Sequence, residues 1–371
     1  MKRCETESGL ILVPMLSSTP DGTINAGLGV RSLLGLNRPP EDRSKENQWD
    51  KAFLRVNDQI KHRWVRWAVR WATLHLAALI AEKRVKVFTS HHAPFFASGH
   101  LVVIHDVIPF RMPARYPAQT FYTRHFLATV MLSAEAVVTI SGTVSEALVE
   151  LFPEVRSRLC VIPSYSTKLE AAAVAGHGEA SGRSPKDFLM VGMTRRHKNL
   201  DWGAKAVEEA ASRMSGLRLD AVGVWREFWP DVIAASAMPG RRSNLVLHDY
   251  VSDATLDEYY SRARALLYLS TDEGMGLPPL EALARGCPVV CSDIPIFHEV
   301  CGEAAFYVPL HDIGALAALI EKLASGELDS EIRRRLELAR ARIAAYGFGP
   351  LSQRWRELLN NYSRSRNPMV I

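Results

Sequence analysis

The residues best suited to chemistry lie in the segment 270–282, where two glutamates flank a turn rich in glycine and proline. Paired glycines allow a tight turn and let backbone N–H groups approach a ligand. The two prolines that follow suit the first positions of a helix. A glycine turn that leads into a helix N-terminus is an anion site and suits a diphosphate. The predicted backbone contacts are Gly274, Met275, Gly276 and Leu277.

The two glutamates of this segment have different predicted roles. Glu281 lies one turn into the expected helix, where its carboxylate can accept hydrogen bonds from the vicinal hydroxyls of a ribose. Glu273 precedes the turn and could face a sugar. A βα unit with an ordinary capped helix is the structural alternative, because short glycine motifs have many false positives. The order glutamate, two glycines, two prolines, glutamate favours the functional interpretation.

A basic cluster follows the expected strand 188–191. Gly192 ends the strand, and Arg195, Arg196 and Lys198 precede the next expected helix. Positive side chains at the end of a strand can neutralise the phosphates of a donor and of its departing nucleoside diphosphate. A solvated charge run is the alternative for such a cluster taken alone. The sequence leaves open which of the two arginines contacts the diphosphate.

Histidines supply a weaker signal in the first half of the chain. His105 lies at the end of the expected strand 101–105, where it could reach a ligand, although a lone histidine is more often structural. His91 and His92 follow an earlier expected strand and are weaker candidates. The spacing of the three matches no recognised metal site, so no metal is predicted.

A glycine loop follows the first expected strand, at Gly27 and Gly29. Such a loop could cover phosphates, and a plain surface loop is an equal alternative. The absence of a third glycine and of an acidic ribose ligand at the usual spacing disfavours a dinucleotide site.

A stretch of tryptophans and arginines covers residues 61–71. Trp64, Trp67 and Trp71 share one face of an expected helix, and Arg63, Arg66 and Arg70 share the adjacent face. We favour a core helix with its arginines in water. An interfacial helix on anionic lipid is the alternative.

Short apolar runs alternate with longer helical stretches along the chain, which predicts an α/β fold with parallel sheets covered on both faces. The expected strands cover residues 10–14, 85–89, 101–105, 136–140, 159–163, 188–191, 217–222, 245–248, 265–269, 288–291 and 304–308. Residues 169–186 are rich in Ala, Gly, Ser and Glu and are predicted to be a linker. The sequence therefore predicts two Rossmann-like domains, residues 1–168 and 187–346, with the candidate residues at the carboxyl ends of strands, where ligands bind.

Bulk properties agree with two domains in one chain of 371 residues. The net charge is +5, and residues 1–170 carry 21 Lys and Arg against 15 Asp and Glu. This mild excess suits a membrane surface or a phosphorylated substrate and is too weak to indicate nucleic acid. Five scattered cysteines, a polar N-terminus and no apolar run long enough for a span predict a cytoplasmic protein, at most peripheral on the inner face of the membrane.

These motifs together resemble a known family. The segment from Glu273 to Glu281 is similar to the E-x7-E motif of the retaining glycosyltransferases of family 4, which have the GT-B fold. The similarity covers nearly the whole chain and is strongest in residues 187–310, where it includes 250–256 and 286–300. It also includes the segment that begins at His105. It is closest to the bacterial polysaccharide-building mannosyltransferases of that family.

The resemblance implies roles for the candidate residues. His105, Glu273 and Lys198 would serve in catalysis, and Glu281 would bind the ribose. One of the two arginines would share the diphosphate with Lys198, and the base would lie at Tyr250 and Val251. The loop of Gly27 and Gly29 would close over the phosphates. The fold implies a donor cleft between the domains and a last helix, within residues 347–371, that returns to the first domain.

The resemblance also implies the substrates. GDP-mannose is the first expected donor and a UDP-sugar the second, with no further cofactor. The acceptor would be a hydroxyl of a glycan or of a polyprenyl-linked glycan. Two alternatives stay open: a nucleotide-sugar 2-epimerase on the same fold, and a non-catalytic sugar-binding protein with two domains.

Overall fold

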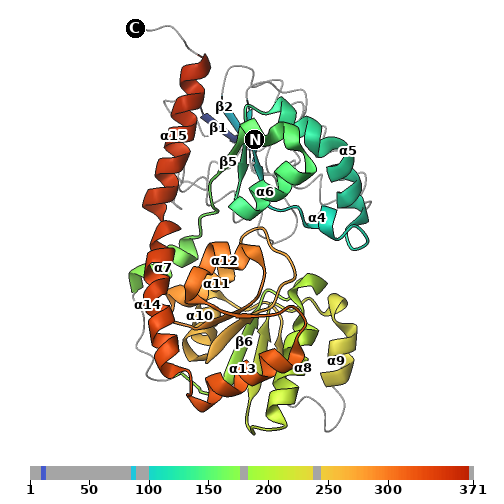
Figure 1. Cartoon of the computed structure of the whole chain (residues 1–371), viewed down its shortest axis with the longest axis vertical. Coiled ribbons are helices and arrows are strands. Elements are labelled where there is room, and N and C mark those ends of the chain that lie inside the picture. The colour runs from blue at the N-terminus through green and yellow to red at the C-terminus, as the bar shows by residue number, and fades with distance from the viewer. Residues whose placement is uncertain (1–9, 14–84, 89–99, 176–182, 237–243, 367–371) are drawn as a thin grey trace, which may run out of the picture. The chain divides into compact units, whose positions relative to one another are not determined.

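The computed structural model describes residues 10–13, 85–88, 100–175, 183–236 and 244–366. The chain divides into two compact units, Met1–Ser166 with Phe348–Ile371 and Thr167–Gly347 (Figure 1). Gly27 and Gly29, His91 and His92, and the expected helix of residues 61–71 lie outside the described residues.

The first unit contains a parallel sheet whose five described strands follow one another in chain order. These strands are β1 (Leu10–Val13), β2 (Val85–Phe88), β3 (His100–Ile104), β4 (Ala136–Thr139) and β5 (Leu159–Val161). The helical elements are α4 (Ile108–Arg111), α5 (Pro117–Ser133), α6 (Gly142–Leu151), the 3-10 helix η2 (Pro153–Arg158) and α15 (Phe348–Arg366). Val102 and Ile104 of β3 pack with Leu127 and Val130 of α5 in the core of this unit.

The second unit contains a six-stranded parallel sheet in the order β11-β10-β9-β6-β7-β8. Its strands are β6 (Asp187–Val191), β7 (Arg218–Val222), β8 (Leu245–His248), β9 (Ala265–Tyr268), β10 (Val289–Ser292) and β11 (Phe306–Val308). The near-continuous apolar runs of the sequence became these strands because both faces of the sheet are covered.

Helices connect the strands of the second unit. They are α7 (Thr167–Ala175), η3 (Arg196–Lys198), α8 (Leu200–Ala211), η4 (Arg226–Phe228), α9 (Pro230–Ser236), α10 (Asp253–Arg262), α11 (Leu277–Ala284), α12 (Pro295–Cys301), η5 (Gly302–Ala304), α13 (Ile313–Ser325) and α14 (Asp329–Ala345). Side-chain caps begin several of them: Ser252 Oγ accepts from Thr255 N at 3.1 Å, and Asp312 Oδ1 accepts from Ala315 N at 2.9 Å.

The segment predicted as a linker differs in part from that prediction. Residues 169–175 lie in α7, which packs against α11 of the second unit. Residues 169–175 include the helix formers Leu, Glu and Ala, and the first glycine of the segment comes only at residue 176. The overall composition of 169–186 concealed this local helix.

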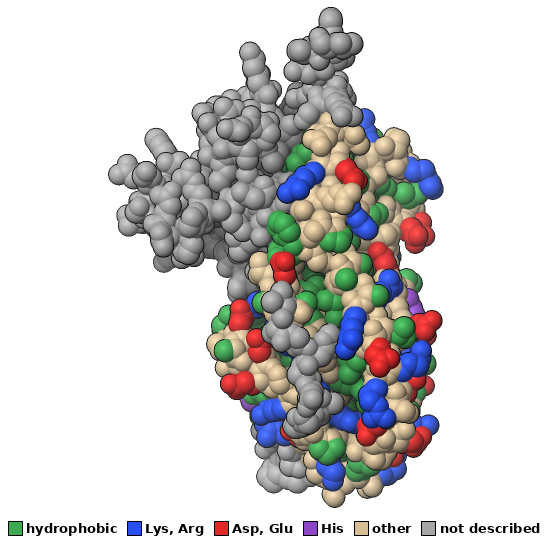
Figure 2. Space-filling view, turned by 90° about the vertical axis from the view of Figure 1, so that its left-hand side faces the viewer, with side chains coloured by type: hydrophobic (Ala, Val, Ile, Leu, Met, Phe, Trp, Pro, Cys, Tyr) green, Lys and Arg blue, Asp and Glu red, His purple; other side chains and the backbone are tan. Residues whose placement is uncertain are grey.

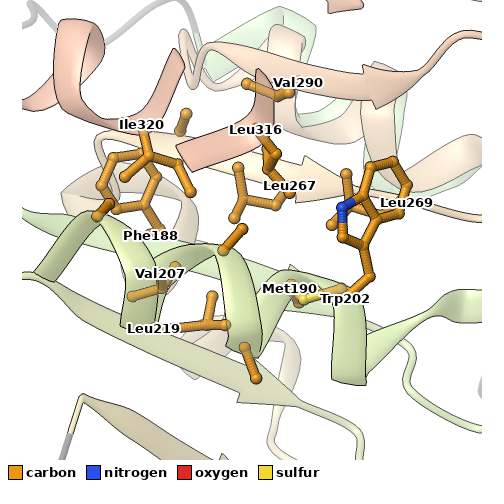
Figure 3. Close-up of a cluster of buried hydrophobic side chains, with 14 of the residues drawn as sticks. Phe188, Met190, Trp202, Val207, Leu219, Leu267, Leu269, Val290, Leu316 and Ile320 are labelled. Carbon is orange, nitrogen blue, oxygen red and sulfur yellow. The ribbon is translucent and has the colours of Figure 1, made fainter. Parts of the chain in front are cut away.

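The core of the second unit lies between the sheet and the helices α8 and α13 (Figure 3). Phe188 and Leu267 of neighbouring strands are fully buried there, with Val207 of α8 and Ile320 of α13. Side chains of this size each stabilise the fold by about 1.5–3 kcal/mol when they leave water.

The strand order of the second unit changes direction between β6 and β9. The chain proceeds outward from β6 through β7 to β8, and then from β9 through β10 to β11 on the other side. β6 and β9 therefore flank the switch point of the strand order. Open α/β sheets bind ligands at such a point, in the crevice outside the carboxyl ends of the strands.

Candidate active site

Two candidate residues meet at this crevice. Lys198 lies in the loop after β6 and Glu273 in the loop after β9, 75 positions later. Their side chains form an ion pair with 2.5 Å between Lys198 Nζ and Glu273 Oε1. Both are largely buried, with 14% and 12% of the side chain exposed. The structure thus joins the basic cluster and the glycine turn, which the sequence showed as separate motifs.

Tyr268 belongs to the same group, and sequence reasoning missed it. It ends β9, is buried, and its hydroxyl accepts a hydrogen bond of 2.9 Å from Lys198 Nζ. Burial raises the pKa of Tyr268 well above its ordinary value, and the negative charge of Glu273 raises it further. The phenol therefore stays protonated and holds Lys198 beside Glu273. A tyrosine in an apolar strand gives no sign of such a role, because it is equally suited to the core.

Glu273 remains ionised although it is buried. Burial alone raises the pKa of a carboxyl, but the positive charges of Lys198 and His197 and the hydrogen bond from Lys198 lower it more, so that the pKa of Glu273 lies below its ordinary value. His197, also buried, was not singled out in the sequence because it lies within a run of basic residues. A charged carboxylate in a poorly solvated crevice is suited to accept hydrogen bonds from a sugar.

Asn199 connects the two loops. Its backbone is left-handed with φ of 53°, a conformation that asparagine tolerates better than most residues. Its Nδ2 donates to Leu269 O at 2.7 Å and to Thr271 Oγ1 at 2.8 Å. These bonds hold the loop of Lys198 against the loop of Glu273.

The predicted glycine turn is present between β9 and α11. Gly276 has φ of 91° and directly precedes α11, and a Cβ at this position would lie 3.0 Å from Phe297 Cε1. Only glycine fits both restrictions without strain. Prolines occupy the start of α11 as predicted, and Glu281 is buried within that helix. Of the first three residues of α11, only Leu277 has a backbone N–H, because Pro278 and Pro279 lack this donor.

The predicted ribose and base residues lie near one another. Tyr250, with 84% of its surface exposed, and half-buried Val251 follow β8. Lys168 of α7 forms a 2.6 Å ion pair with Asp253 in the same loop region. Burial lowers the pKa of Lys168, but Asp253, through its hydrogen bond and charge, and Glu281, through its charge, raise it above the ordinary value. Lys168 therefore has Glu281 as a neighbour as well as the loop of Tyr250.

The two arginines of the basic cluster have different surroundings. Arg196 makes a bidentate pair with Asp231 of α9, at 2.5 and 3.2 Å, and lies 5.0 Å from the ring centre of Trp229. Arg195 lies 5.0 Å from the ring centre of Trp225 and 4.7 Å from that of Phe228. Among the described residues, its side chain hydrogen-bonds to Thr194 O at 3.0 Å and forms no ion pair with a carboxylate.

Met193 occupies the position directly after the strand glycine. It is buried, and its carbonyl accepts from Trp229 Nε1 at 2.8 Å and from Trp225 N at 3.2 Å. These bonds hold the tryptophans on which both arginines lie.

His105 belongs to the other unit. It directly follows β3 and is half-buried, as expected for a residue at the carboxyl end of a central strand. Asp106 Oδ1 next to it accepts a hydrogen bond of 3.1 Å from Ile108 N at the start of α4. Its position at a carboxyl edge agrees with the sequence expectation, and its role in a reaction stays a prediction.

Beside the site, Asp220 of β7 is the centre of a buried ionic group. Its carboxylate accepts hydrogen bonds from Arg218 at 2.8 and 3.1 Å and from Arg262 at 2.7 Å, and it lies 2.7 Å from His248 Nε2. The side chain of Asp220 is 2% exposed. Burial raises its pKa, but the hydrogen bonds from Arg218 and His248 and the two arginine charges lower it more, so that the pKa lies below its ordinary value.

We expect Asp220→Asn to lower the free energy of unfolding by about 1–3 kcal/mol at pH 7, because it leaves hydrogen-bonding cations without their charge partner. A carboxyl whose pKa is lowered on folding stabilises the fold fully above its unfolded pKa, about 4, and loses this contribution as the pH falls through the folded pKa. Urea unfolding at pH 7 and about pH 3 measures the difference. If the free energies of unfolding of wild type and variant differ as much at about pH 3 as at pH 7, the lowered pKa of Asp220 would be contradicted.

No helix in the described ranges combines the length and apolar character that a membrane crossing requires. In the same ranges, no group of three or more His, Cys, Asp or Glu side chains is placed to share a metal ion.

Comparison with known proteins relates this geometry to a family. Residues 185–326 match the family described as glycosyl transferases group 1. The O-antigen chain mannosyltransferase RfbU of Salmonella typhimurium is 28% identical over 250 residues, which are 64% of this chain and 64% of that protein. The O-antigen chain mannosyltransferase B of Escherichia coli is 27% identical over 277 residues, 68% of this chain and 69% of that protein. The match thus spans less than two thirds of the length of the first relative.

Solved structures show the same fold. The α,α-trehalose 6-phosphate synthase of Burkholderia multivorans aligns with a TM-score of 0.63 over 88% of this chain and 83% of that one, at 14% identity. At 14% identity this likeness shows the fold alone, which consists of two Rossmann-like units. Residues 185–326, which match the glycosyl transferases group 1 family, carry the Lys198–Glu273 pair and the glycine turn, and the chain has the GT-B fold.

Proposed function

We propose that this protein transfers a sugar, mannose first, from a nucleoside diphosphate sugar to a hydroxyl of a glycan or of a polyprenyl-linked glycan, with retention of the anomeric configuration. The observation that carries the proposal is the buried Lys198–Glu273 pair at the strand switch point, beside the glycine turn before α11. The family of residues 185–326 supports it independently.

Each residue of the site has a role in this proposal. Glu273 accepts hydrogen bonds from hydroxyls of the donor sugar, and Glu281 accepts them from the ribose. Lys198 and the backbone N–H groups of Met275, Gly276 and Leu277 stabilise the charge on the diphosphate as it leaves. The bond from the anomeric carbon to the diphosphate oxygen breaks while a bond to the acceptor oxygen forms on the same face, and the acceptor proton passes to the leaving diphosphate. The protein contributes position and charge stabilisation. We propose His105 as a further residue that acts on the sugar.

The donor assignment rests on the relatives. Two of them are named as O-antigen chain mannosyltransferases, which supports mannose as the sugar and surface polysaccharide as the product. GDP-mannose is therefore the first donor to test and a UDP-sugar the second. The loop of Tyr250 and Val251 would contact the base. Such a protein would work in the cytoplasm, at the inner face of the membrane.

The test measures GDP release from GDP-mannose with and without a mannoside or polyprenyl-linked acceptor. The proposal expects acceptor-dependent GDP release and a glycosylated product. Nucleotide release without acceptor would indicate the 2-epimerase, and binding of the donor without turnover would indicate a sugar-binding protein.

We expect transfer to continue in excess chelator, because the described site offers Lys198 and arginine for the diphosphate. Activity that is lost with chelator and restored by magnesium or manganese would contradict metal independence.

We also expect the two arginines to differ in donor binding. Arg195 forms no carboxylate pair in the described structure, whereas Arg196 is held by Asp231. Arg195→Ala should weaken GDP binding by about 1.5–3 kcal/mol, the range for a hydrogen bond to a charged group. Arg196→Ala should leave GDP affinity within about threefold of wild type. Calorimetric titration of both variants measures this, and a larger loss in Arg196→Ala would reverse the assignment.

A further inference from the structure

The exposed face of α5 carries two large apolar side chains together with the polar Arg124, His125 and Thr129. One face of this helix contributes Leu127, Val130 and Met131 to the core of the first unit. On the exposed side, Phe121 has 59% of its surface in contact with solvent and Leu132 has 40%. Large apolar side chains exposed on a helix face beside basic residues suit a partner that offers both apolar and anionic groups.

Within residues 107–134 the charged side chains have one sign, and Asp106 and the exposed Glu135 border this segment. Residues 107–134 contain no Asp, Glu or Lys, and carry Arg111, Arg115 and Arg124, all exposed. The face of the molecule in Figure 2 is different, since Lys and Arg side chains lie there among Asp and Glu side chains in its described part. The three arginines, which flank α4 and lie on α5, suit an anionic surface.

The aromatic residues of α5 form a group at this surface. The ring of Phe121 lies 4.5 Å from that of His125 and 6.4 Å from that of Phe126, between ring centres. Tyr122 stacks on Phe126 at 5.5 Å and is itself buried. Phe121 is thus supported from behind and presents its ring outward. Exposed aromatic rings together with arginines are the side chains that interfacial helices place at the boundary of headgroups and acyl chains.

The geometry points to an anionic lipid bilayer as the partner of the α4–α5 surface, which we define as Arg111, Arg115, Phe121, Arg124 and Leu132. Phe121 and Leu132 enter the interfacial layer, and the arginines pair with lipid phosphates. A second copy of the chain fits less well, because a symmetric contact would bring the same arginines of both copies together. This inference rests on the proposed function for its purpose. The surface follows His105 directly in the chain, so that docking brings a lipid-linked acceptor toward that carboxyl edge.

The test is cosedimentation of the full chain with vesicles of phosphatidylcholine alone and with about a third of phosphatidylglycerol, at low and high salt. We expect binding to the anionic vesicles that weakens with salt. The triple variant Arg111→Glu, Arg115→Glu, Arg124→Glu should bind at least about tenfold more weakly, since each basic residue near such a surface contributes to the attraction. Phe121→Ser should weaken binding without a change in charge.

The matched control reverses three exposed arginines elsewhere, Arg156→Glu, Arg333→Glu and Arg340→Glu, and has the same net charge as the test variant. It should bind nearly as wild type. Equal losses in both triple variants would show that only net charge matters and would overturn the inference. If the α4–α5 variants bind vesicles as strongly as wild type, the inference is also overturned. That result would favour the expected helix of residues 61–71 as the lipid contact. No vesicle binding, or a dimer that Phe121→Ser dissociates, would equally overturn it.

The vesicle experiment tests the docking surface separately from the proposed function. Transfer to a soluble mannoside acceptor should be the same in the α4–α5 variants and in wild type, because none of these residues belongs to the site. Vesicle binding without any transfer would remove the proposed function and leave the docking surface. Transfer to the soluble acceptor without vesicle binding would remove the docking surface and leave the proposed function.

Discussion

Glu273→Gln should lower turnover by about 10²–10³-fold while the protein stays folded, because the substitution removes a charge that positions the donor sugar in a poorly solvated site. The carboxylate is held in place by Lys198 at 2.5 Å and is ionised despite its burial. Glutamine has nearly the same shape, but it is uncharged and has one acceptor oxygen where the carboxylate has two. The loss should appear mainly in kcat, since the diphosphate and the ribose keep their own contacts.

Initial rates and thermal unfolding of this variant provide the measurement. The control is Glu303→Gln, a glutamate of the same unit whose side chain is 79% exposed and lies outside the crevice. It should retain the rate of wild type. Turnover of Glu273→Gln within a few-fold of wild type would exclude the role of Glu273 in transfer.

Lys198→Met should have the largest effect on stability and an effect on turnover as large as that of Glu273→Gln. It leaves the carboxylate of Glu273 buried without its main partner, and breaking a buried pair in this way costs about 3–5 kcal/mol of stability. It also removes the cation next to the diphosphate, which should lower turnover by about 10²–10³-fold.

The double variant Lys198→Met, Glu273→Gln separates the two effects. Because the unpaired charge is gone, we expect the double variant to recover much of the lost stability but none of the turnover. Chemical denaturation of wild type, both single variants and the double variant completes the cycle. A single Lys198→Met variant as stable as wild type would show that the ion pair is absent in solution.

Much of the fold was predictable from the sequence, for identifiable physical reasons. Parallel strands covered on both faces are apolar throughout, which is why residues 188–191 and 265–269 could be identified as strands. The start of α11 was predictable because Pro278 and Pro279 fit only the first turn of a helix. The helix α7 was not predicted, because its alanines lie in a segment that also contains glycine and serine.

The positions of Lys198 and Glu273 at strand ends were predictable, but their contact was not. Lys198 and Glu273 were each expected at the end of a strand, yet their pairing depends on β6 and β9 being neighbours in the sheet. The participation of Tyr268 could not be inferred, because a buried tyrosine in a strand is ordinary core. The difference between Arg195 and Arg196 depends on Asp231, which lies 35 positions after Arg196 on a separate helix.

The central claim is that the carboxyl edge of the second unit binds a nucleoside diphosphate. Calorimetric titration of the full chain with GDP, UDP, ADP and dTDP tests it directly. The account predicts one site with preference for GDP, weakened by about 1–3 kcal/mol in Glu281→Ala through the loss of charged hydrogen bonds to the ribose. A preference for UDP would change the donor and keep the site, whereas no binding of any of the four nucleotides would contradict the central claim.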